Sequence, residues 1–315
     1  MNGSVFLALD SSCYTTSYAL WANESVKHDA RKLLEVPQGA RGLRQSEMVF
    51  QHVRNYGMLF SDFPHEGQTI RAVAYSEKPC PREGSYMPAF LAGKSLAVAI
   101  AASMGVPAYA LTHQHGHIYS GFIGNDIQDG EFCALHASGG TLDILNVHVA
   151  QGIVETITPM GGTADVTCGQ IIDRIGVAAG LAFPAGAEME RVYTPNGIKL
   201  SVHVEGLKAN LSGAETQAMR LLENGCDRAS VFSGVLDCAA ETLAGLTGNA
   251  LEQTKSGRFL FTGGVICNRI VRERLQKACE DRAAQAIFAQ KQYCGDNACG
   301  LALAAQRVYE RGESA

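Results

Sequence analysis

Apolar runs separated by small polar or glycine turns divide the first third of the chain into a regular series of elements. The pattern predicts strands at residues 5–10 and 17–21, joined by a turn of small polar residues, and a third strand at 71–75. The Ala-rich segment 89–104 predicts a helix, and the apolar run 106–111 predicts a buried strand after it. This series is a β-hairpin followed by a β-α-β unit.

A similar series begins again at Phe132. Strands are predicted at 132–137 and 142–149 around a glycine tip, and helical spacing covers residues 169–174. The closing elements are predicted as helix, strand, helix, strand and helix over residues 230–254, 258–261, 268–279, 285–289 and 296–309. No low-complexity linker separates the halves. The repetition predicts a duplicated α/β fold with two lobes that clamp a nucleotide in the cleft between them.

Composition narrows the class of protein. With 315 residues the chain is long enough for two domains, and its net formal charge of −5 argues against binding nucleic acid alone through a broad basic face. No apolar run reaches membrane-spanning length without a polar break, and the N-terminus does not resemble a signal peptide, so we predict a cytoplasmic protein without membrane contact. The ten cysteines include no Cys-x-x-Cys, and we interpret them mostly as small buried side chains in a reducing compartment.

The segment Thr112–His117 carries three histidines directly after a predicted buried strand. His113 and His117 are four residues apart, so on a helix both imidazoles lie on one face. Two neutral ring nitrogens are suited to zinc or iron. His115 points to another side and is the weaker ligand candidate. The alternative is that all three histidines are solvated or cap the helix.

Asp296 is the candidate for a third metal ligand. Two histidines need an oxygen-bearing partner to make an open catalytic site. Asp296 follows Gly295 and precedes an apolar helix, and a strand-to-helix junction is where an α/β fold places ligand-binding residues. The alternative is that Asp296 is the N-cap of the last helix.

Two glycine pairs are candidates for nucleotide contact. Ser138-Gly139-Gly140 forms the tip of the second predicted hairpin, where the two glycines suit either a primed turn or the approach of a phosphate to backbone amides. Gly263-Gly264 follows a very apolar strand and precedes a helix. A strand-to-helix turn rarely needs two glycines, so close approach to a nucleotide is the favoured interpretation there.

Each of two further polar residues has two interpretations, one structural and one as a ligand-binding residue. Asn268 opens a predicted helix, where it is either an N-cap or a hydrogen-bond partner of a base or ribose. Asp173 lies in a segment of helical spacing. It is either a surface acid paired with Arg174 or another cation, or a carboxylate that holds ribose hydroxyls.

These motifs occur in an order that is specific although each alone is weak. The chain resembles the tRNA threonylcarbamoyladenosine transferase family, once labelled O-sialoglycoprotein endopeptidase, from Leu7 to about Arg311. The motifs that carry the resemblance are His113-x-x-x-His117, Ser138-Gly139-Gly140, Asp173, Pro184-Ala185-Gly186, Gly206-Leu207-Lys208, Gly263-Gly264-Val265-x-x-Asn268 and Asp296-Asn297. The resemblance implies a duplicated actin/Hsp70/sugar-kinase fold. The domains are then residues 1–112, completed by the C-terminal helix 296–315, and residues 113–295, with the nucleotide and metal site at the interface.

The resemblance also implies ligands and partners. It implies one divalent metal, iron or zinc, held by His113, His117 and Asp296, and an adenine nucleotide or adenylate as substrate. The substrate contacts are expected at His136, Ala137, Ser138, Gly139, Gly140, Asp173, Gly186, Gly263, Gly264 and Asn268. Partner proteins of the family make the adenylate and assemble on the transferase, so tRNA is expected to be engaged with their help. A homo- or heterodimer through the N-terminal lobe is a further expectation.

The chain departs from the family pattern at several points. The first hairpin of the family carries an acidic pair after Ser-Cys, whereas Ser12-Cys13 is followed here by Tyr14-Thr15. A Gly-Pro-Gly turn is replaced by residues 78–84, and the histidine after Ser-Gly-Gly by Thr141. The family's Phe-Ser before Gly-Leu-Lys becomes Val-Glu at 204–205. These departures predict a divergent paralogue that keeps the metal and nucleotide sites and changes the acceptor side.

The sequence and the resemblance leave three candidate functions for the chain. The first is metal-dependent transfer of a carbamoyl or threonylcarbamoyl group from an adenylate to an acceptor amine, which in the resembled family is adenosine N6 beside the tRNA anticodon. The second is a paralogue that binds nucleotide and metal as a scaffold or sensor, or that has an altered acceptor. The third is a metalloprotease, which is the least favoured because no His-Glu-x-x-His supplies a general base beside a metal.

Overall fold

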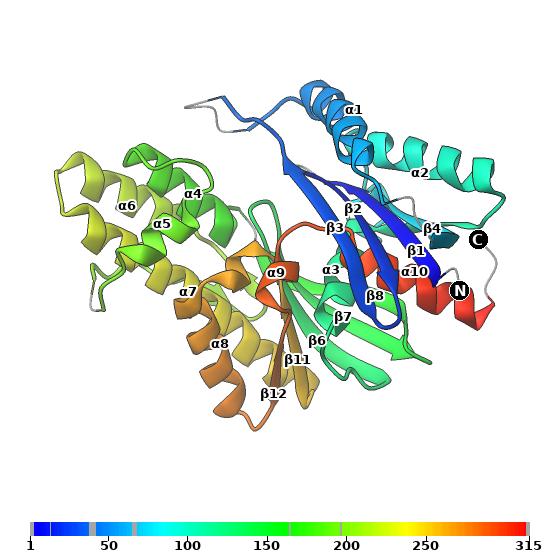
Figure 1. Cartoon of the computed structure of the whole chain (residues 1–315). Helices are drawn as coiled ribbons and strands as arrows, with labels where there is room; N and C mark the ends of the chain where they lie inside the picture. Colours follow the sequence, from blue (N-terminus) through cyan, green and yellow to red (C-terminus); the bar gives the residue numbers. More distant parts are fainter. Residues whose placement is uncertain are drawn as a thin grey trace. The chain divides into compact units, whose positions relative to one another are not determined.

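The structure is a computed structural model that describes residues 3–12, 14–37, 42–64, 68–163, 165–195 and 197–312 (Figure 1). The chain divides into two compact units. Unit 1 contains residues 1–129, 149–155 and 296–315, and unit 2 contains residues 130–148 and 156–295. The compact units thus group residues 113–129 with the N-terminal part of the chain. The division into functional domains after residue 112 stays a prediction.

Unit 1 is built on a five-stranded sheet with the order β3-β2-β1-β4-β5. The hairpin strands pair antiparallel, whereas β1, β4 and β5 run parallel. The strands are β1 (Gly3–Ser11), β2 (Thr15–Ala22), β3 (Ser25–Leu33), β4 (Gln68–Lys78) and β5 (Ala108–Thr112). The helices are α1 (Gln45–Ser61), α2 (Phe90–Met104), α3 (His113–Phe122) and α10 (Cys299–Arg311).

Alternating residues of β1 face different helices, which explains why the strand is apolar throughout. Val5, Leu7 and Leu9 belong to a buried cluster that also contains side chains from α1 and α2. Phe6 contacts Tyr309 of α10 on the other side, with ring centroids 5.6 Å apart. Because successive strand residues point to opposite faces, helices on both faces bury every position of the run.

Unit 2 is built on a larger sheet with the order β12-β11-β6-β7-β8-β10-β9. Its strands are β6 (Gly130–Ala137), β7 (Leu142–Ala150), β8 (Ile153–Thr163), β9 (Val204–Glu205), β10 (Lys208–Ala209), β11 (Arg258–Thr262) and β12 (Gln285–Phe288). Its helices are α4 (Cys168–Ala178), α5 (Gly186–Arg191), α6 (Ser212–Glu223), α7 (Arg228–Thr254), η1 (Gly264–Cys267), α8 (Arg269–Glu280) and α9 (Lys291–Cys294).

The two sheets repeat one strand order. Reading from the third strand of each series, β3-β2-β1-β4-β5 corresponds to β8-β7-β6-β11-β12, and the short β9 and β10 extend the second sheet. In both series the first strand pairs parallel with the fourth, and the fourth with the fifth. The predicted duplication of an α/β series is therefore confirmed.

Within the part of the chain that the structure describes, one helix, α7, is long and apolar enough to cross a membrane by length and composition alone. Its most apolar window is 67% buried within the structure. Sixteen of its residues are buried, and many of them belong to the main apolar cluster of unit 2. A helix that is buried on most sides in a core has the same composition as a membrane span, so α7 is a core helix.

Candidate metal centre and ligand-binding turns

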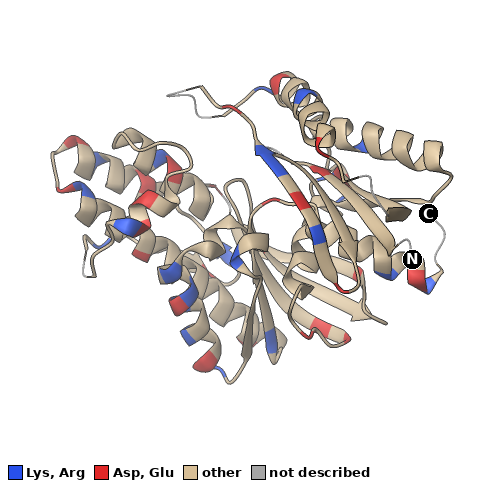
Figure 2. Ribbon diagram, in the orientation of Figure 1, with Lys and Arg blue, Asp and Glu red and all other residues tan. Residues whose placement is uncertain are grey.

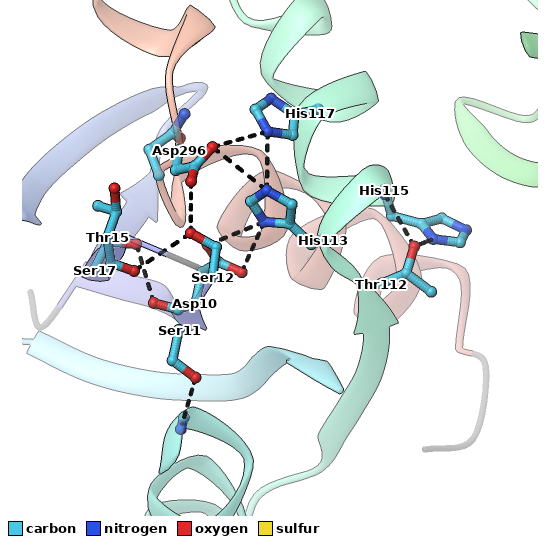
Figure 3. A network of polar contacts seen from close by, with 12 residues as sticks. Asp10, Ser11, Ser12, Thr15, Ser17, Thr112, His113, His115, His117 and Asp296 are labelled. Atoms are coloured by element: carbon cyan, nitrogen blue, oxygen red, sulfur yellow. Dashed lines mark hydrogen bonds and ion pairs between the residues drawn. The ribbon is translucent and has the colours of Figure 1, made fainter. Parts of the chain in front are cut away.

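The two histidines predicted to share a helix face lie together at the start of α3. The helix begins at His113 because the Thr112 side chain caps it, accepting a hydrogen bond from the His115 amide at 3.2 Å. His117 lies one turn further on. The Nε2 atoms of His113 and His117 are 3.1 Å apart, and Figure 3 shows both rings directed toward the same point.

Asp296 joins this pair from the segment that precedes α10. Its Oδ1 atom lies 3.5 Å from His113 Nε2 and 3.3 Å from His117 Nε2 (Figure 3). The helix itself begins only at Cys299, so the N-cap interpretation of Asp296 is wrong. Asn297 is the side chain that accepts from the Cys299 amide, at 2.8 Å. All three residues belong to unit 1.

The spacing of these three ligand atoms fits a metal ion. Protein nitrogen and oxygen ligands lie about 2.0–2.2 Å from zinc, so two ligands of one ion are separated by about 2.9–3.6 Å. The observed separations of 3.1, 3.3 and 3.5 Å fall within that range. Two imidazoles with one carboxylate suit both zinc and non-haem iron.

Asp10 lies next to His113 and is not among the site residues that the sequence predicts. Both of its carboxylate oxygens lie 3.1 Å from His113 Nδ1, and its side chain is fully buried. A carboxylate on the second ring nitrogen fixes the tautomer and orientation of a metal-binding histidine. In the sequence, the only sign of this role is that the strand β1 ends in an acidic residue. Such a residue indicates a site only when the strand order is known, because parallel strands end at the same edge of a sheet.

Ser12 fixes Asp296 in a similar way. Its hydroxyl donates a hydrogen bond of 2.6 Å to Asp296 Oδ2, the oxygen on the side away from the histidines. The Ser12 carbonyl in turn accepts from His52 Nε2 at 2.7 Å, and His52 is buried in α1. Ser12, in the turn after β1, is thereby hydrogen-bonded both to Asp296 and to His52.

The buried charges of the site influence each other strongly. Burial alone would lower the pKa of His113, but Asp10 and Asp296 together raise it well above its ordinary value. Burial and the neighbouring His113 charge lower the pKa of His117. Burial would raise the pKa of Asp296, yet His113 and His117 hold it well below the usual range. Without metal, these effects favour a proton on His113, between two carboxylates, and disfavour one on His117.

Metal affinity is expected to rise with pH because a protonated His113 cannot bind a metal. To bind through Nε2, His113 must lose the Nε2 proton, while its Nδ1–H stays hydrogen-bonded to Asp10. Below the raised pKa of His113, the affinity should increase about ten-fold per pH unit, and it should level off above that pKa. Competition titration with a zinc indicator from pH 5 to 9 measures this. Asp10→Asn removes a cause of the raised pKa and should move the levelling point to lower pH. An affinity that does not change across this range would contradict the assignment.

The Ser138–Thr141 turn is tight and leaves its glycines open. The Ser138 amide donates to the Thr141 carbonyl at 2.8 Å, and the Thr141 amide donates to Ser138 Oγ at 3.1 Å. Gly139 and Gly140 are exposed, and neither has a positive φ, so the primed-turn interpretation is wrong. The preceding His136 and Ala137 are buried in β6. The part of this loop open to a ligand is therefore the glycine pair.

The second glycine pair has two distinct roles. Gly263 has a φ of 101°, and a Cβ there would lie 2.2 Å from the Ala137 carbonyl oxygen. The backbone of β6, and not a ligand, thus requires this glycine. Gly264 is exposed and has open space at its Cβ position. Contact with a nucleotide stays a prediction, and Gly264 is the member of the pair that it concerns.

The capping interpretation of Asn268 is confirmed. Its Oδ1 accepts hydrogen bonds from the amides of Ile270 and Val271 at 3.0 and 3.2 Å, at the start of α8. The cap uses the side-chain oxygen of Asn268, so a ligand would accept a hydrogen bond from the side-chain amide nitrogen. The ligand-binding role of Asn268 stays a prediction.

Asp173 lies in α4, as its helical spacing predicted, but not in an ion pair with Arg174. Its Oδ1 accepts from the Ala185 amide at 2.8 Å and holds the turn that leads into Gly186 and α5. Arg174 pairs instead with Glu215 at 3.0 Å. Burial raises the pKa of Asp173, although the Ala185 hydrogen bond opposes the rise. Whether Asp173 also meets a ribose stays a prediction.

The departures of the first hairpin are packed into unit 1. Tyr14 packs against an apolar cluster that contains Leu34, Met48 and Ala89, and Thr15 is 6% exposed. Cys13 lies outside the described residues. The loop at residues 78–84 also reaches α3, because the Pro79 carbonyl accepts from the Gln114 amide at 3.0 Å. Both departures therefore lie near the first turn of α3 or the turn after β1.

A model of the family described as tRNA N6-adenosine threonylcarbamoyltransferase matches residues 58–303, more than three quarters of the chain. The chain belongs to this family. A member from Paraburkholderia xenovorans is 28% identical over 95% of this chain and 90% of its own length. A member from Methanopyrus kandleri is 28% identical over 92% of this chain and 77% of its own length. The family predicted from the ordered motifs is confirmed.

Solved structures of other proteins share the fold. HypF in its phosphate- and nucleotide-bound form has a TM-score of 0.59 at 11% identity, covering 99% of this chain and 56% of HypF. The chain thus spans about half the length of HypF. A 2-hydroxyisocaproyl-CoA dehydratase activator from Clostridium difficile gives 0.57 at 12% identity, covering 98% of this chain and 97% of the activator. A glucokinase from Streptomyces griseus gives 0.54 at 10% identity, covering 96% and 98%. The predicted actin/Hsp70/sugar-kinase fold is confirmed.

Proposed function

We propose that the chain transfers a threonylcarbamoyl group from an adenylate to an amine, in a reaction that depends on a metal at His113, His117 and Asp296. The observation that supports this most strongly is the convergence of these three side chains within 3.5 Å of one another, in a chain of a threonylcarbamoyltransferase family. The family description names adenosine N6 of tRNA as the acceptor, and we propose the same class of acceptor here.

The residues around the triad have supporting roles in this proposal. Bound iron or zinc would supply a Lewis acid that polarises the acyl oxygen of the donor. Asp10 orients His113 through Nδ1, and Ser12 orients Asp296 through Oδ2. No protein nucleophile is required for attack by an amine, in agreement with a sequence that contains no Gly-x-Ser-x-Gly.

The adenylate is proposed to bind at the open glycine turns of unit 2. Gly139, Gly140 and Gly264 leave space for a phosphate or base to approach the backbone. The Asn268 amide would donate to the nucleoside, and Asp173, with Gly186 beside it, would accept from the ribose hydroxyls. Gly263 supports this surface from within, because it lets the turn pack on β6.

Gly264→Val is expected to reduce adenine-nucleotide binding at least about ten-fold while the fold persists, because a side chain would enter open space over the turn. Isothermal titration with an adenine nucleotide measures the affinity, and thermal unfolding checks the fold. Gly257→Val is the control, since this glycine is also open at its Cβ position but lies before β11, away from the turn. Unaltered affinity in Gly264→Val would remove the turn from the site.

We expect tRNA to be engaged together with partner proteins. Three basic residues of α8 pair with acids: Arg269 with Glu273, Arg274 with Glu241 and Lys277 with Asp281. The fourth, Arg272, donates to the backbone carbonyls of Ile266 and Ala289. In Figure 2, Lys and Arg residues alternate with Asp and Glu residues along the ribbon of this helix. Since phosphate binding requires uncompensated positive charge, this helix is expected to give little affinity for RNA by itself.

A second candidate is a paralogue that binds metal and nucleotide but acts on another acceptor or none. The packing of Tyr14 and Thr15 favours it, because both positions that are acidic in the family pattern are built here as neutral, partly or fully buried side chains. One experiment separates the two. The purified chain, with measured metal content, is given threonylcarbamoyl-adenylate and unmodified tRNA, and modified adenosine is measured. Bound metal and nucleotide without modification would support the second candidate.

A further inference from the structure

Two cysteines of unit 2 lie on short helices that pack on each other. Cys267 ends η1 and Cys294 ends α9. Arg272 reaches toward both, because its guanidinium donates to the carbonyl of Ile266, next to Cys267, and lies 3.5 Å from Cys294 Sγ. Cys267 Sγ also lies 3.6 Å from the Lys291 carbonyl, and Cys294 Sγ lies 3.3 Å from the Ala289 carbonyl. The pair is separated by 27 residues in sequence and is brought together by the fold.

A fixed cation lies beside the pair. Arg272 Nη2 is 3.5 Å from Cys294 Sγ. The guanidinium also donates to the carbonyls of Ile266 and Ala289 at 2.8 and 2.7 Å, and it lies 4.9 Å from the centre of the Phe288 ring. These contacts hold the positive charge in place, which favours a thiolate at the pair.

The two thiols differ in access to solvent. Cys267 is partly exposed, whereas Cys294 is fully buried. The hydrogen bond from Cys294 lowers the pKa of Cys267 to about 7, against the effect of burial and with help from Arg272 and Lys291. By contrast, burial raises the pKa of Cys168, Cys238 and Cys279 elsewhere in unit 2. An accessible thiol of low pKa beside a second thiol has the features of a redox-sensitive cysteine with a resolving partner.

We propose that Cys267 and Cys294 are a peroxide-sensitive dithiol that closes to a disulfide. The Cys267 thiolate attacks hydrogen peroxide, its sulfur is oxidised to a sulfenic acid, and the released hydroxide takes a proton to become water. The Cys294 sulfur then attacks the sulfenic sulfur. The S–S bond forms, hydroxide leaves and takes up the Cys294 proton. Two thiols and one peroxide thus give one disulfide and two waters.

This modification goes beyond the transferase proposal and lies next to its nucleotide turn. Cys267 directly precedes Asn268, and η1 begins at Gly264. A disulfide would link this turn covalently to α9. Oxidation is therefore expected to weaken adenine-nucleotide binding if the turn is the nucleotide site. The disulfide itself does not depend on that assignment, so the two ideas can fail separately.

Mapping the disulfide tests the proposal directly. The full chain is treated with stoichiometric hydrogen peroxide, remaining thiols are blocked, and peptides are analysed by mass spectrometry. We expect one dominant disulfide, Cys267–Cys294, that dithiothreitol reverses. In Cys294→Ser we expect a sulfenic acid at Cys267 that dimedone traps, and in Cys267→Ser neither product. Oxidation distributed over other cysteines, or no Cys267–Cys294 peptide, would overturn the proposal.

A second measurement uses the unaltered protein and needs no variant to fold. At pH 7, Cys267 should react with iodoacetamide about three-fold faster than an ordinary thiol, since its larger thiolate fraction outweighs the lower nucleophilicity of a low-pKa sulfur. Cys226, which is also partly exposed in unit 2, is the internal comparison. The Cys267 rate should level off above about pH 7. A Cys267 rate below that of Cys226 at pH 7 would contradict the reactive role.

Discussion

His117→Ala is expected to lower the metal affinity of the chain by at least about 100-fold, because even the loss of an outer contact to a metal ligand costs 10- to 100-fold. His117 is 2% exposed, and its Nε2 lies 3.1 Å from that of His113. Alanine at this position would leave two of the three ligand atoms. Metal content after dialysis against a weak chelator, measured by mass spectrometry, gives the result.

The same helix offers the matched control. His115 lies between the two candidate ligands in sequence, but its Nδ1 is hydrogen-bonded to Thr112 Oγ1 at 2.6 Å, and Figure 3 shows its ring directed away from Asp296. His115→Ala should therefore keep the metal. Equal metal content in His117→Ala and the unaltered protein would show that the triad is not a metal site. Equal loss in both variants would point to damage to α3 instead.

The chain is expected not to replace a housekeeping threonylcarbamoyl transferase unaided. Tyr14 and Thr15 stand where the family pattern has two acids, a difference of about two charges in a partly desolvated region. Those neutral side chains cannot reproduce the field that would orient an acceptor amine. Complementation of a cell that lacks the transferase, with modified adenosine measured in its tRNA, checks this. Full restoration would show that the departures are tolerated.

The hairpin can be tested by restoring its charges. Tyr14→Asp with Thr15→Glu should recover modification if the missing acids are the cause. Because Tyr14 packs against Leu34 and Met48, the double substitution also places carboxylates against apolar side chains and costs stability. Tyr14→Asn with Thr15→Gln is the control, since it makes the same change of size without charge. Failure of both variants at normal protein level would direct attention to residues 78–84 or to another acceptor.

The sequence predicted most of the fold because its apolar runs have clear periods. The strands of both hairpins, the helix before β5 and the long helix α7 all lie where the pattern placed them. It did not predict β8, whose burial follows no simple alternation, or α1, whose exposed Phe50 and Val53 obscure its helical pattern. The last helix begins at Cys299, three residues later than its apolar run suggested.

The site was predictable only in part, for a geometric reason. Helical spacing was enough to predict that the side chains of His113 and His117 lie together. Asp10 lies 103 residues from His113, and Ser12 lies 284 residues from Asp296, so their contacts depend on strand order. Gly263 illustrates the same limit, because a glycine pair in the sequence does not show that the Ala137 carbonyl requires one of its members. Contact of Gly263 with a nucleotide stays a prediction.

The discontinuity of unit 1 has a consequence for synthesis of the chain. Asp10 and Ser12 are made first, His113 and His117 follow, and Asp296 is added only after all of unit 2. The triad and the packing of α10 on β1 therefore become available together, when the segment that contains Asp296 and α10 leaves the ribosome. A metal bound by all three residues would then close a loop of some 180 residues and add its binding free energy to the folded state only. Metal loading in the cell would thus mark chains whose synthesis has passed α10, and a chain stopped within unit 2 would carry an N-terminal sheet with one face uncovered.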